Sequence, residues 1–408
     1  PISSGVRGKI MGIMKTAMEK DPELKLKYSE RFFSLSNVQE YEEGTLECYR
    51  RFAVADEKRA LEKELGEWIG ADAGRRERWG SLLGDLDAGY KAISELKRDE
   101  NYYRECLVRG SSVFLVAVRL SGKMKQNWKS LHKLYSSLDM ELERRIFRCC
   151  LEEYLSNVSA KHLGPYQKEL LQRFGSDWDA ICSEVWDKSA LSDPERFGKL
   201  EKCPELCEND PLLRFYNDVK IVDFHKEEES LCKKDVLSLG REYTRALYGM
   251  RLDKGIMQYP DANSTMRLSY GRVSSLSPRD AVLLDWRTSV AGILQKEEKD
   301  SYDFSLRKDW RDMLETSPFC KRFNWNGEVD FLTDNDITGG NSGSPVLDSR
   351  GRLIGLAFDG NKESLAGDSS YTRDYNKSIN VDIRYVLYVL GEYAGMERII
   401  TELGLRNW

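Results

Sequence analysis

The sequence predicts a multidomain α+β protein, with a large α-helical domain over residues 1–258 and a smaller, β-rich domain over residues 259–408. From Lys9 to Leu200, apolar residues recur three and four positions apart, as they do on one face of a helix. After Tyr259 the pattern changes to short runs of strand-forming residues, broken by Gly, Asn and Asp. The length of 408 residues is also more than one typical domain.

The helical part contains recognisable helix starts. Asp21 and Asp193 are each followed by Pro, and an aspartate cap with proline in the first turn satisfies free amides and sets the backbone for a helix. The segment Glu201–Asp210 is interpreted as a connector, and apolar residues from Val236 to Met250 predict one more helix. The charged helix faces are interpreted as solvated surface.

In the second domain, β-type runs predict strands, and a helix is expected to close the chain from about Ile383 to Leu403. No internal repeat of solenoid period is present. The strands are expected over Thr265–Tyr270, Ser344–Leu347 and Leu353–Phe358.

The composition excludes several classes of protein. Acidic and basic residues nearly balance, with a net charge of −5, so nothing indicates nucleic-acid binding. No run approaches the roughly 20 apolar residues that a membrane span needs, and the start has no signal-peptide core. Because the first residue is Pro1 rather than Met, we expect the numbering to begin inside a longer protein, with any export signal upstream.

The nine cysteines form no repeating framework, so they indicate neither a disulfide-stabilised mini-domain nor a particular compartment. Cys203 and Cys207 could be half of a metal site, but no second Cys or His pair follows at finger-like spacing. We therefore expect buried or unpaired thiols and no metal.

The run Thr338–Leu347, Thr-Gly-Gly-Asn-Ser-Gly-Ser-Pro-Val-Leu, carries the chemistry. A serine hydroxyl is a poor nucleophile unless a base takes its proton and fixed donors receive the oxyanion. Glycines around Ser342 let the backbone curl so that the N–H groups of Gly340 and Ser342 point at one spot. The run therefore predicts Ser342 as a nucleophile, and the alternative is a plain turn that joins two strands. Ser344 is assigned to the start of the second strand.

Residues 340–345, Gly-Asn-Ser-Gly-Ser-Pro, resemble the Gly-Asp-Ser-Gly-Gly-Pro pattern of chymotrypsin-like peptidases, in which the two amides form the oxyanion hole. More specifically, the chain resembles bacterial serine dipeptidyl-peptidases of the dipeptidyl-peptidase 7 and 11 type. The resemblance is strong over the C-terminal third and rests mainly on architecture over the helical part. The segments that carry it are Tyr259–Gly271, Ser277–Ala281, Thr333–Leu347, Ile354–Asn361 and Ser378–Val386.

The resemblance implies a double β-barrel with a large helical domain inserted between its halves. Residues 259–408 would then be the C-terminal half of a chymotrypsin-like double barrel with a terminal helix. Residues 1–258 would be a helical domain that covers the active site, preceded by a short leading flank. The first barrel half is missing from this scheme.

The activity that the resemblance implies is a serine-type dipeptidyl-peptidase, an aminopeptidase that releases dipeptides from the free N-terminus of oligopeptides. In that type the general base His and its Asp come from the first barrel half, and neither pattern occurs here. His132, His162 and His225 are interpreted as surface or packing residues. We therefore expect the chain alone to be catalytically incomplete. The alternatives are a non-catalytic peptide-binding relic and a helical scaffold protein.

One substrate-binding position is carried over from the helical domain. Asn37, with Gly44 seven residues later, matches an Asn that helps to bind the substrate ammonium group. This sequence departs from the usual pattern, because Val38 and Gln39 replace the aromatic residues. A helix-cap or turn Asn is the alternative.

Three further positions are carried over onto the strand that ends at residue 360. Phe358 would line the pocket, Asp359 would help to hold the ammonium group, and Gly360 would set the preference at the cleaved bond. In peptidases of this type, an Arg at that last position accompanies a preference for Asp or Glu before the cleaved bond. Glycine instead leaves the space empty and uncharged. We therefore expect hydrophobic or bulky residues to be preferred, with a strand-end Asp-Gly turn as the alternative.

No metal ion or organic cofactor is needed for this chemistry. The resemblance implies oligopeptides with a free N-terminus as partners and export to the periplasm or cell surface. The resemblance is also compatible with a homodimer.

Overall fold

The computed structural model describes residues 2–120, 127–203, 207–219, 224–231, 235–259, 265–299, 301 and 304–405. The chain divides into two compact units, of which the first comprises Pro1–Glu43 and Arg59–Gln258 and the second comprises Gly44–Lys58 and Tyr259–Trp408. The change of texture seen in the sequence at residue 259 coincides with the last junction between the units, between Gln258 and Tyr259. The segment Gly44–Lys58 belongs to the second unit although it lies far from it in the sequence. The roles assigned to the two predicted domains stay predictions.

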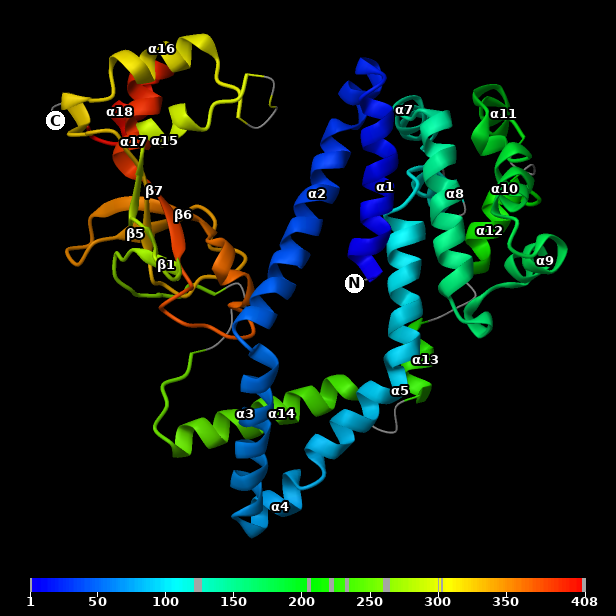
Figure 1. The fold of residues 1–408 in the computed structure, drawn as a ribbon, viewed down its shortest axis with the longest axis horizontal. Coiled ribbons are helices and arrows are strands. Elements are labelled where there is room, and N and C mark those ends of the chain that lie inside the picture. Colours follow the sequence, from blue (N-terminus) through cyan, green and yellow to red (C-terminus); the bar gives the residue numbers. More distant parts are fainter. Residues whose placement is uncertain are drawn as a thin grey trace. The chain divides into compact units, whose positions relative to one another are not determined.

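The first unit is built from helices, most of which are labelled in Figure 1. Its largest buried cluster includes Ile10 on α1, Val116 on α6 and Ile146 on α8, each almost inaccessible to solvent. None of the helices that the structure describes has the length and apolar character of a bilayer-spanning segment. The helices are α1 (Ile2–Met18), α2 (Pro22–Arg51), α3 (Val54–Gly70), α4 (Ala73–Trp79), α5 (Leu82–Tyr102), α6 (Val113–Leu120), α7 (Trp128–Ser136), α8 (Met140–Asn157), α9 (Pro165–Phe174), α10 (Trp178–Cys182), α11 (Pro194–Leu200), α12 (Pro211–Val219), α13 (Phe224–Leu231) and α14 (Val236–Asp253).

The two predicted helix starts are confirmed. Helix α2 begins at Pro22, and the Asp21 carboxylate accepts a hydrogen bond from the Glu23 amide at 2.8 Å. Helix α11 begins at Pro194, and the Asp193 carboxylate accepts one from the Arg196 amide at 2.8 Å. Both caps satisfy amides that the first helical turn leaves free.

The charged helix faces were expected to be solvated surface, and this expectation fails at some positions. Glu143 on α8 is fully buried and accepts hydrogen bonds from Tyr28 at 3.1 Å, Ser111 at 2.8 Å and Arg31 at 2.8 Å. Burying a carboxylate costs free energy unless charged and polar partners surround it. Amphipathic spacing cannot reveal such partners, because they come from other helices.

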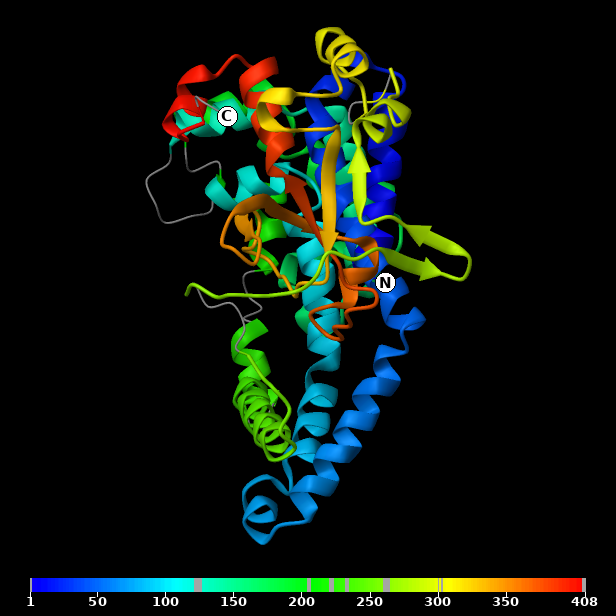
Figure 2. The same ribbon diagram turned by 90° about the vertical axis from the view of Figure 1, so that its left-hand side faces the viewer.

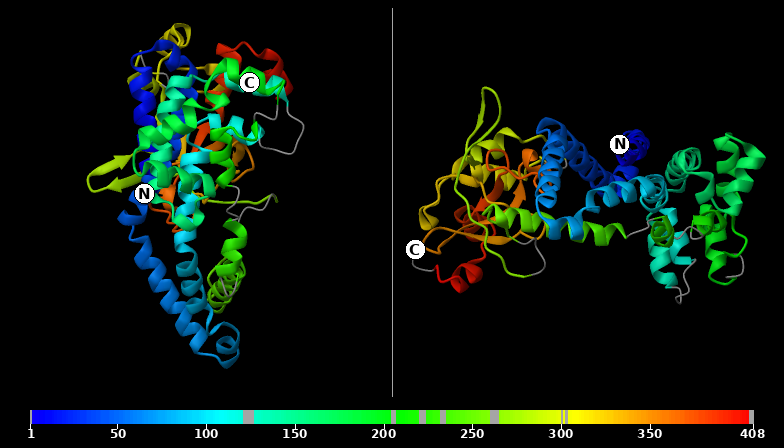
Figure 3. Two further views of the ribbon diagram at one scale, coloured as in Figure 1. Left: turned by 90° about the vertical axis from the view of Figure 1, so that its right-hand side faces the viewer. Right: turned by 90° about the horizontal axis from the view of Figure 1, so that it is seen from below.

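The second unit contains the β-structure. Within the described residues, five strands form an antiparallel sheet in the order β3-β4-β7-β6-β5, and β1 and β2 form a separate hairpin. This hairpin projects from the sheet in Figure 2 and in both panels of Figure 3. The predicted strands Ser344–Leu347 and Leu353–Phe358 are confirmed as β5 and most of β6. The strands are β1 (Leu276–Arg279), β2 (Val282–Leu284), β3 (Arg287–Ser289), β4 (Glu328–Thr333), β5 (Ser344–Leu347), β6 (Leu353–Gly360) and β7 (Ser378–Asp382).

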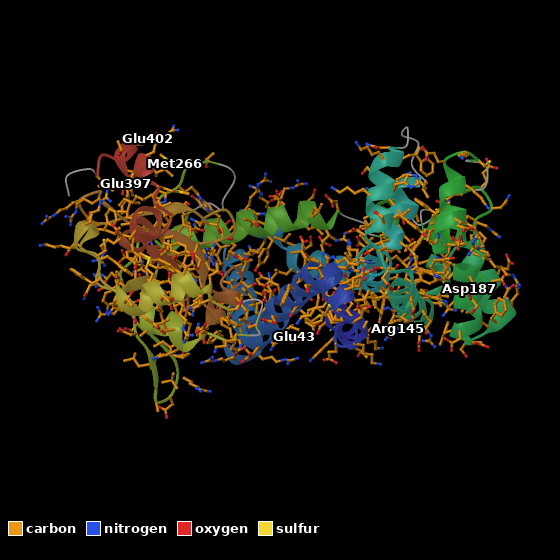
Figure 4. The ribbon with its side chains drawn as sticks, turned by 90° about the horizontal axis from the view of Figure 1, so that it is seen from above. Glu43, Arg145, Asp187, Met266, Glu397 and Glu402 are labelled. Carbon is orange, nitrogen blue, oxygen red and sulfur yellow. The ribbon has the colours of Figure 1, made fainter. Side chains whose placement is uncertain are left out.

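The predicted strand Thr265–Tyr270 is wrong. Residues 265–272 have no strand structure, and only Val273, next to them, makes an isolated bridge, to Thr333. Met266, labelled in Figure 4, and Leu268 are almost completely exposed. An alternating pattern indicates which side chains could share one face of a strand. The strand itself forms only where a neighbouring strand pairs with its backbone amides and carbonyls.

The predicted terminal helix is broken into shorter pieces. Helix α17 (Ile383–Tyr388) continues as the π-helical turn η8 (Val389–Tyr393), and α18 (Glu397–Glu402) follows a turn. The break is at Gly395, whose φ of +62° lies in the left-handed region that glycine adopts without strain. Figure 4 labels Glu397 and Glu402 at the two ends of α18.

The core of the second unit joins its sheet to its helices. Trp325 is fully buried, and its ring stacks on Tyr388 of α17 with centroids 4.2 Å apart. Helices α15 (Val290–Gln295) and α16 (Lys308–Thr316) contribute Val290 and Leu314 to the same cluster. Val329 of β4 belongs to the same cluster, which therefore joins the sheet to these helices.

Gly355 in β6 lets Phe331 of β4 cover the centre of the sheet. A Cβ atom at residue 355 would lie 2.6 Å from the Phe331 ring and 2.6 Å from the Val381 carbonyl. Such distances are far below van der Waals contact, so any side chain would displace the ring or the neighbouring strand.

We expect Gly355→Ala to lower the free energy of unfolding by about 1–3 kcal/mol because of this overpacking. At Gly292 in α15 an added Cβ meets nothing within 4 Å. Gly292→Ala should therefore raise the free energy of unfolding by about 0.4–1 kcal/mol. Denaturant unfolding followed by tryptophan fluorescence measures both, and equal effects at the two positions would contradict the packing argument.

Candidate active site

The loop between β4 and β5 presents Ser342 on tight turns. The Asn341 amide donates to the Thr338 carbonyl at 3.1 Å, and the Ser344 amide donates to the Asn341 carbonyl at 2.9 Å. The Asn341 side chain closes the first turn, because its Oδ1 accepts from the Thr338 amide at 3.1 Å. Ser344, the first residue of β5, is thus part of the strand start, as expected.

Two glycines give this loop its shape. Gly340 has φ +103° and Gly343 has φ +83°, conformations that other residues adopt only with strain. The Gly343 amide then donates to the Ala357 carbonyl at 2.7 Å, which extends the pairing of β5 with β6 to the residue before β5. Ser342, which directly precedes Gly343, is thereby placed beside the end of β6.

The Ser342 side chain is exposed, and its hydroxyl donates to the Phe358 carbonyl at 3.3 Å. A backbone carbonyl cannot take the proton of a serine, so this bond orients the hydroxyl without activating it. Within the described residues, the hydroxyl has no imidazole partner, and His132 and His162 both belong to the first unit. His132 is exposed beside Glu201, and His162 is buried between Asp99 and Glu227.

His132 is thus a surface residue and His162 a packing residue, in line with their interpretation from the sequence. The side chain of His225 lies outside the described residues.

The backbone amides of Gly340 and Ser342 are unused as donors. Neither donates a hydrogen bond to any residue that the structure describes. Both flank the exposed Ser342 hydroxyl in a loop that is not paired as a strand. The two amides are therefore available to an incoming acceptor, which an oxyanion hole requires. Their role as an oxyanion hole stays a prediction.

A β-bulge marks the point where Ser342 meets β6. Ala357 pairs with Asn380 and Asp359 pairs with Ile379, so Phe358 has no partner on β7. A bulge bends its strand and re-aims side chains, and it often lies next to an active site. Phe358 consequently keeps 45% of its side chain exposed beside the serine.

Asp359 and Gly360 follow on the same strand, so the structure brings three of the predicted binding residues next to Ser342. Asp359 is exposed, and its carboxylate accepts a hydrogen bond from the Gly360 amide at 2.8 Å. One expectation needs correction, since the space beside Gly360 is not empty. A Cβ there would lie 2.5 Å from the hydroxyl oxygen of Ser364, which donates to the Asn361 carbonyl at 2.7 Å.

Asn37 lies in the interior of α2, which rules out the alternative of a cap or turn residue. Its side chain is exposed, and it has no hydrogen-bond partner among the residues that the structure describes. Asparagine is an unfavourable residue inside a helix, so an exposed one without a local bond is not there for helix stability. Asn37 belongs to the first unit, and its role in binding stays a prediction.

The sequence reasoning did not assign Asn361, the residue after Gly360. Asn361 is 8% exposed, and its amide group donates to the Tyr375 carbonyl at 2.8 Å and to Glu363 at 2.9 Å. Its Oδ1 accepts from the Lys377 amide at 2.8 Å. The only signal in the sequence was an asparagine after Asp-Gly, which is equally typical of a surface turn.

Two further contacts hold the loop between β4 and β5 that carries Ser342. The sequence reasoning did not predict them either. The Tyr371 hydroxyl donates to the Asp334 carbonyl at 2.7 Å, and Thr338 donates to the Asp368 carboxylate at 3.3 Å. Burial raises the pKa of the Tyr371 phenol, so it stays protonated and a donor at neutral pH. Residues 361–377 therefore contact both β6 and the segment that leads to Ser342.

Comparison with known proteins identifies the family. The sequence profile of the peptidase S46 family matches residues 1–405. The chain belongs to the peptidase S46 family. It is 31% identical to dipeptidyl-peptidase 7 of Porphyromonas gingivalis over 98% of this chain and 58% of that protein. It is 28% identical to an Asp/Glu-specific dipeptidyl-peptidase of the same species, over 97% of this chain and 57% of that protein.

The fold of this S46 chain is also found in a solved structure. The crystal structure of Porphyromonas endodontalis DPP11 matches with a TM-score of 0.83 and 24% identity, over 99% of this chain and 60% of that one. This likeness shows the fold, a mostly helical protein with small antiparallel sheets. The chain spans less than two thirds of the length of these relatives.

The cysteines and acidic residues build no metal centre in the parts of the chain that the structure covers. No group of three or more His, Cys, Asp or Glu side chains is placed there to hold an ion. Cys203 and Cys207 are both free thiols, and burial raises the pKa of Cys207.

We expect the Ser364 hydroxyl to control substitution at Gly360. Gly360→Ala should force Ser364 to rotate and to lose its bond to the Asn361 carbonyl, which costs about 1 kcal/mol of unfolding free energy. In a Ser364→Ala background the same substitution should cost little. A double-mutant cycle by denaturant unfolding measures the coupling, and additive effects would show that the two residues do not meet.

Proposed function

We propose that the full-length protein is a serine-type dipeptidyl-peptidase that releases dipeptides from the free N-terminus of oligopeptides. The observation that carries this proposal is an exposed serine, Ser342, in a glycine-shaped loop with two neighbouring amides free to donate. Membership of the peptidase S46 family supports the reaction class. Two relatives that are 31% and 28% identical to this chain are named dipeptidyl-peptidases.

In the proposed reaction, a base takes the proton of the Ser342 hydroxyl while its oxygen attacks the carbonyl carbon of the second peptide bond. The Gly340 and Ser342 amides receive the negative charge that develops on the carbonyl oxygen. The shortened peptide leaves with a proton, and water then hydrolyses the acyl-enzyme to release the dipeptide. Both amides are fixed by the loop turns beforehand, so little reorganisation is needed when charge develops.

We further propose that the sheet of the second unit is the C-terminal half of a chymotrypsin-like double barrel. In support, its strands are antiparallel and the serine lies on the loop that enters β5. The proposed general base and its carboxylate partner lie in a part of the protein outside this chain. The exposed Ser342 hydroxyl, with a carbonyl as its described partner, is compatible with a base that approaches from elsewhere.

For substrate recognition, we propose that Asp359 and Asn37 bind the ammonium group and that Phe358 forms a wall of the pocket. Gly360 and Ser364 offer no positive charge to an acidic side chain. The buried ammonium group of Lys377, whose backbone lies beside Gly360, is already held by Ser274 at 2.9 Å and by the Arg373 carbonyl at 2.6 Å. These features favour hydrophobic or bulky residues before the cleaved bond. The exposed Phe358 ring adds apolar surface for them.

A non-catalytic peptide-binding relic is the second candidate function. The observation that favours it is that Ser342 bonds a carbonyl and, in the described part of the chain, no imidazole. Export to the periplasm or cell surface and a homodimer stay predictions from the resemblance.

Removing the nucleophile tests the activity. In the full-length protein, Ser342→Ala should abolish dipeptide release and labelling by an organophosphonate, with a loss of about 10³-fold or more in kcat. Ser344→Ala, two residues away, serves as the matched control and should retain labelling. Labelling that persists in Ser342→Ala would assign the nucleophile elsewhere, and peptide binding without labelling of the wild type would favour the relic.

Dipeptide reporters matched except at the second residue test the preference. We expect Met, Leu or Phe at that residue to give a higher kcat/KM than Asp or Glu, because Gly360 and Ser364 offer no positive charge to an acidic side chain. Gly360→Arg combined with Ser364→Ala, which makes room for the new side chain, should move the preference toward Asp and Glu by about tenfold or more. Faster release after Asp or Glu by the wild type would refute the proposed preference.

A further inference from the structure

A short segment from early in the chain packs on the loop that borders the candidate pocket. Residues 361–377, here called the pocket loop, connect β6 to β7 and include the 3₁₀ turn η7 (Lys362–Ala366). Cys48, Val54 and Ala366 form a buried cluster, with Phe52 and Leu365 packed against it. The segment Gly44–Lys58 and the pocket loop therefore share an apolar core within the second unit.

Gly44 permits this packing. A Cβ at residue 44 would lie 2.5 Å from a methyl carbon of Leu365, so the backbone of α2 approaches the pocket loop as closely as a glycine allows. The contact continues one turn later, where the Cys48 thiol lies 3.4 Å from the Lys362 carbonyl. The glycine seven residues after Asn37 thus has a packing role on the pocket loop.

Beyond this core, an aromatic pair joins the two segments. The rings of Phe52 and Tyr375 have centroids 4.6 Å apart, and the Arg51 guanidinium lies 5.3 Å and 5.8 Å from their centroids. The Tyr49 and Ser369 hydroxyl groups also form a hydrogen bond between the two segments, with their oxygens 2.7 Å apart. Aromatic pairs and cation–π contacts of this kind stabilise one arrangement of the loop relative to others.

Tyr375 links this contact to the pocket. Its backbone carbonyl accepts a hydrogen bond from the Asn361 side chain at 2.8 Å, and Asn361 also accepts from the Lys377 amide at 2.8 Å. The Asn361 side chain thereby ties the start of the pocket loop to its end. Because Asn361 directly follows Asp359 and Gly360, this bond connects Tyr375 to the end of β6, where both residues also pair with β7.

From these contacts we infer that Phe52 is a positioning residue for substrate binding, acting through Tyr375 and Asn361 on Asp359 and Gly360. This inference rests on the proposed function of the Ser342 site. Phe52 does not bond the loop that carries Ser342, so its loss displaces the groups that bind the peptide, whereas the turns around Ser342 keep their own hydrogen bonds. Small displacements of positioned groups weaken binding strongly.

The test uses the full-length protein and a matched pair of phenylalanines. Phe52 and Phe174 are both half-buried and both follow an arginine whose guanidinium lies over the ring, at 5.3 Å and 4.9 Å respectively. Phe174 belongs to the first unit and packs against its core. A loss of stability alone should therefore appear in both Phe52→Ala and Phe174→Ala. An effect on substrate binding should appear in Phe52→Ala only.

For Phe52→Ala we expect KM for a dipeptidyl reporter to rise about tenfold while kcat stays within about twofold. Phe52→Tyr should restore KM to within about twofold, because its ring can stack on Tyr375. Phe174→Ala should leave KM unchanged. An unchanged KM in Phe52→Ala, or the same rise in Phe174→Ala, would overturn the inference.

Two readouts do not depend on activity. Burial raises the pKa of the Cys48 thiol, so it should react slowly with iodoacetamide in the wild type. Its alkylation, followed by peptide mass spectrometry, should accelerate in Phe52→Ala and not in Phe174→Ala. Calorimetry should show about tenfold weaker binding of a product dipeptide to Phe52→Ala.

These readouts separate the two possible failures. If the wild type binds the dipeptide but neither cleaves peptides nor reacts at Ser342, the proposed activity fails, and the binding difference between the variants still decides the role of Phe52. If Cys48 reactivity and dipeptide affinity are the same in Phe52→Ala and the wild type, the positioning role is wrong even in an active enzyme. Absence of dipeptide binding by the wild type would also overturn it.

Discussion

The antiparallel pairing of β5 with β6 is the constraint on which the candidate site depends. Ser344 pairs with Ala357, and the Gly343 amide extends the pairing by one bond to the Ala357 carbonyl. A shift of this register by one residue would turn every side chain of β5 to the opposite face. The register therefore decides that Ser342, and not a neighbour, meets Phe358 at the bulge. The left-handed backbone of Gly343 is the local condition for that bond.

The same end of β6 is supported by residues from two distant parts of the chain. Asn361 bonds to both ends of residues 361–377, and Phe52 stacks on Tyr375 of that loop. Buried polar groups such as Asn361 are costly unless they are satisfied, and a satisfied network specifies one arrangement. The site thus combines a rigid strand pair, which carries the serine, with a tethered loop that borders the binding residues.

Among the residues that the structure describes, Ser342 has free backbone donors beside it but no base as a partner. The two amides beside Ser342 are ready to stabilise negative charge, whereas the hydroxyl is oriented by a carbonyl that cannot accept its proton. Family membership and the exposed serine together favour peptide-bond chemistry. The described histidines belong to the other unit, and the burial of His162 between two carboxylates is a packing arrangement.

Local signals determined much of what could be predicted. Asp21-Pro22 starts a helix because capping and the backbone of proline act over a few residues. The Gly-Asn-Ser-Gly-Ser-Pro run likewise predicted a glycine-shaped turn at Ser342 before the strand that starts at Ser344. β5 and β6 were found from strand-forming residues bounded by turns. In each case the residues that make the structure are neighbours in the chain.

The sequence by itself thus determined the helical character, these strands and the turn that carries Ser342. Only the tertiary structure decided which segments meet. Thr265–Tyr270 has the alternation of a strand but no strand structure, and Ser364 fills the space beside Gly360 that the sequence left empty. The segment Gly44–Lys58 joins the second unit across some 200 residues of helices. Spacing describes one segment at a time, whereas burial and pairing depend on a partner that the pattern does not name.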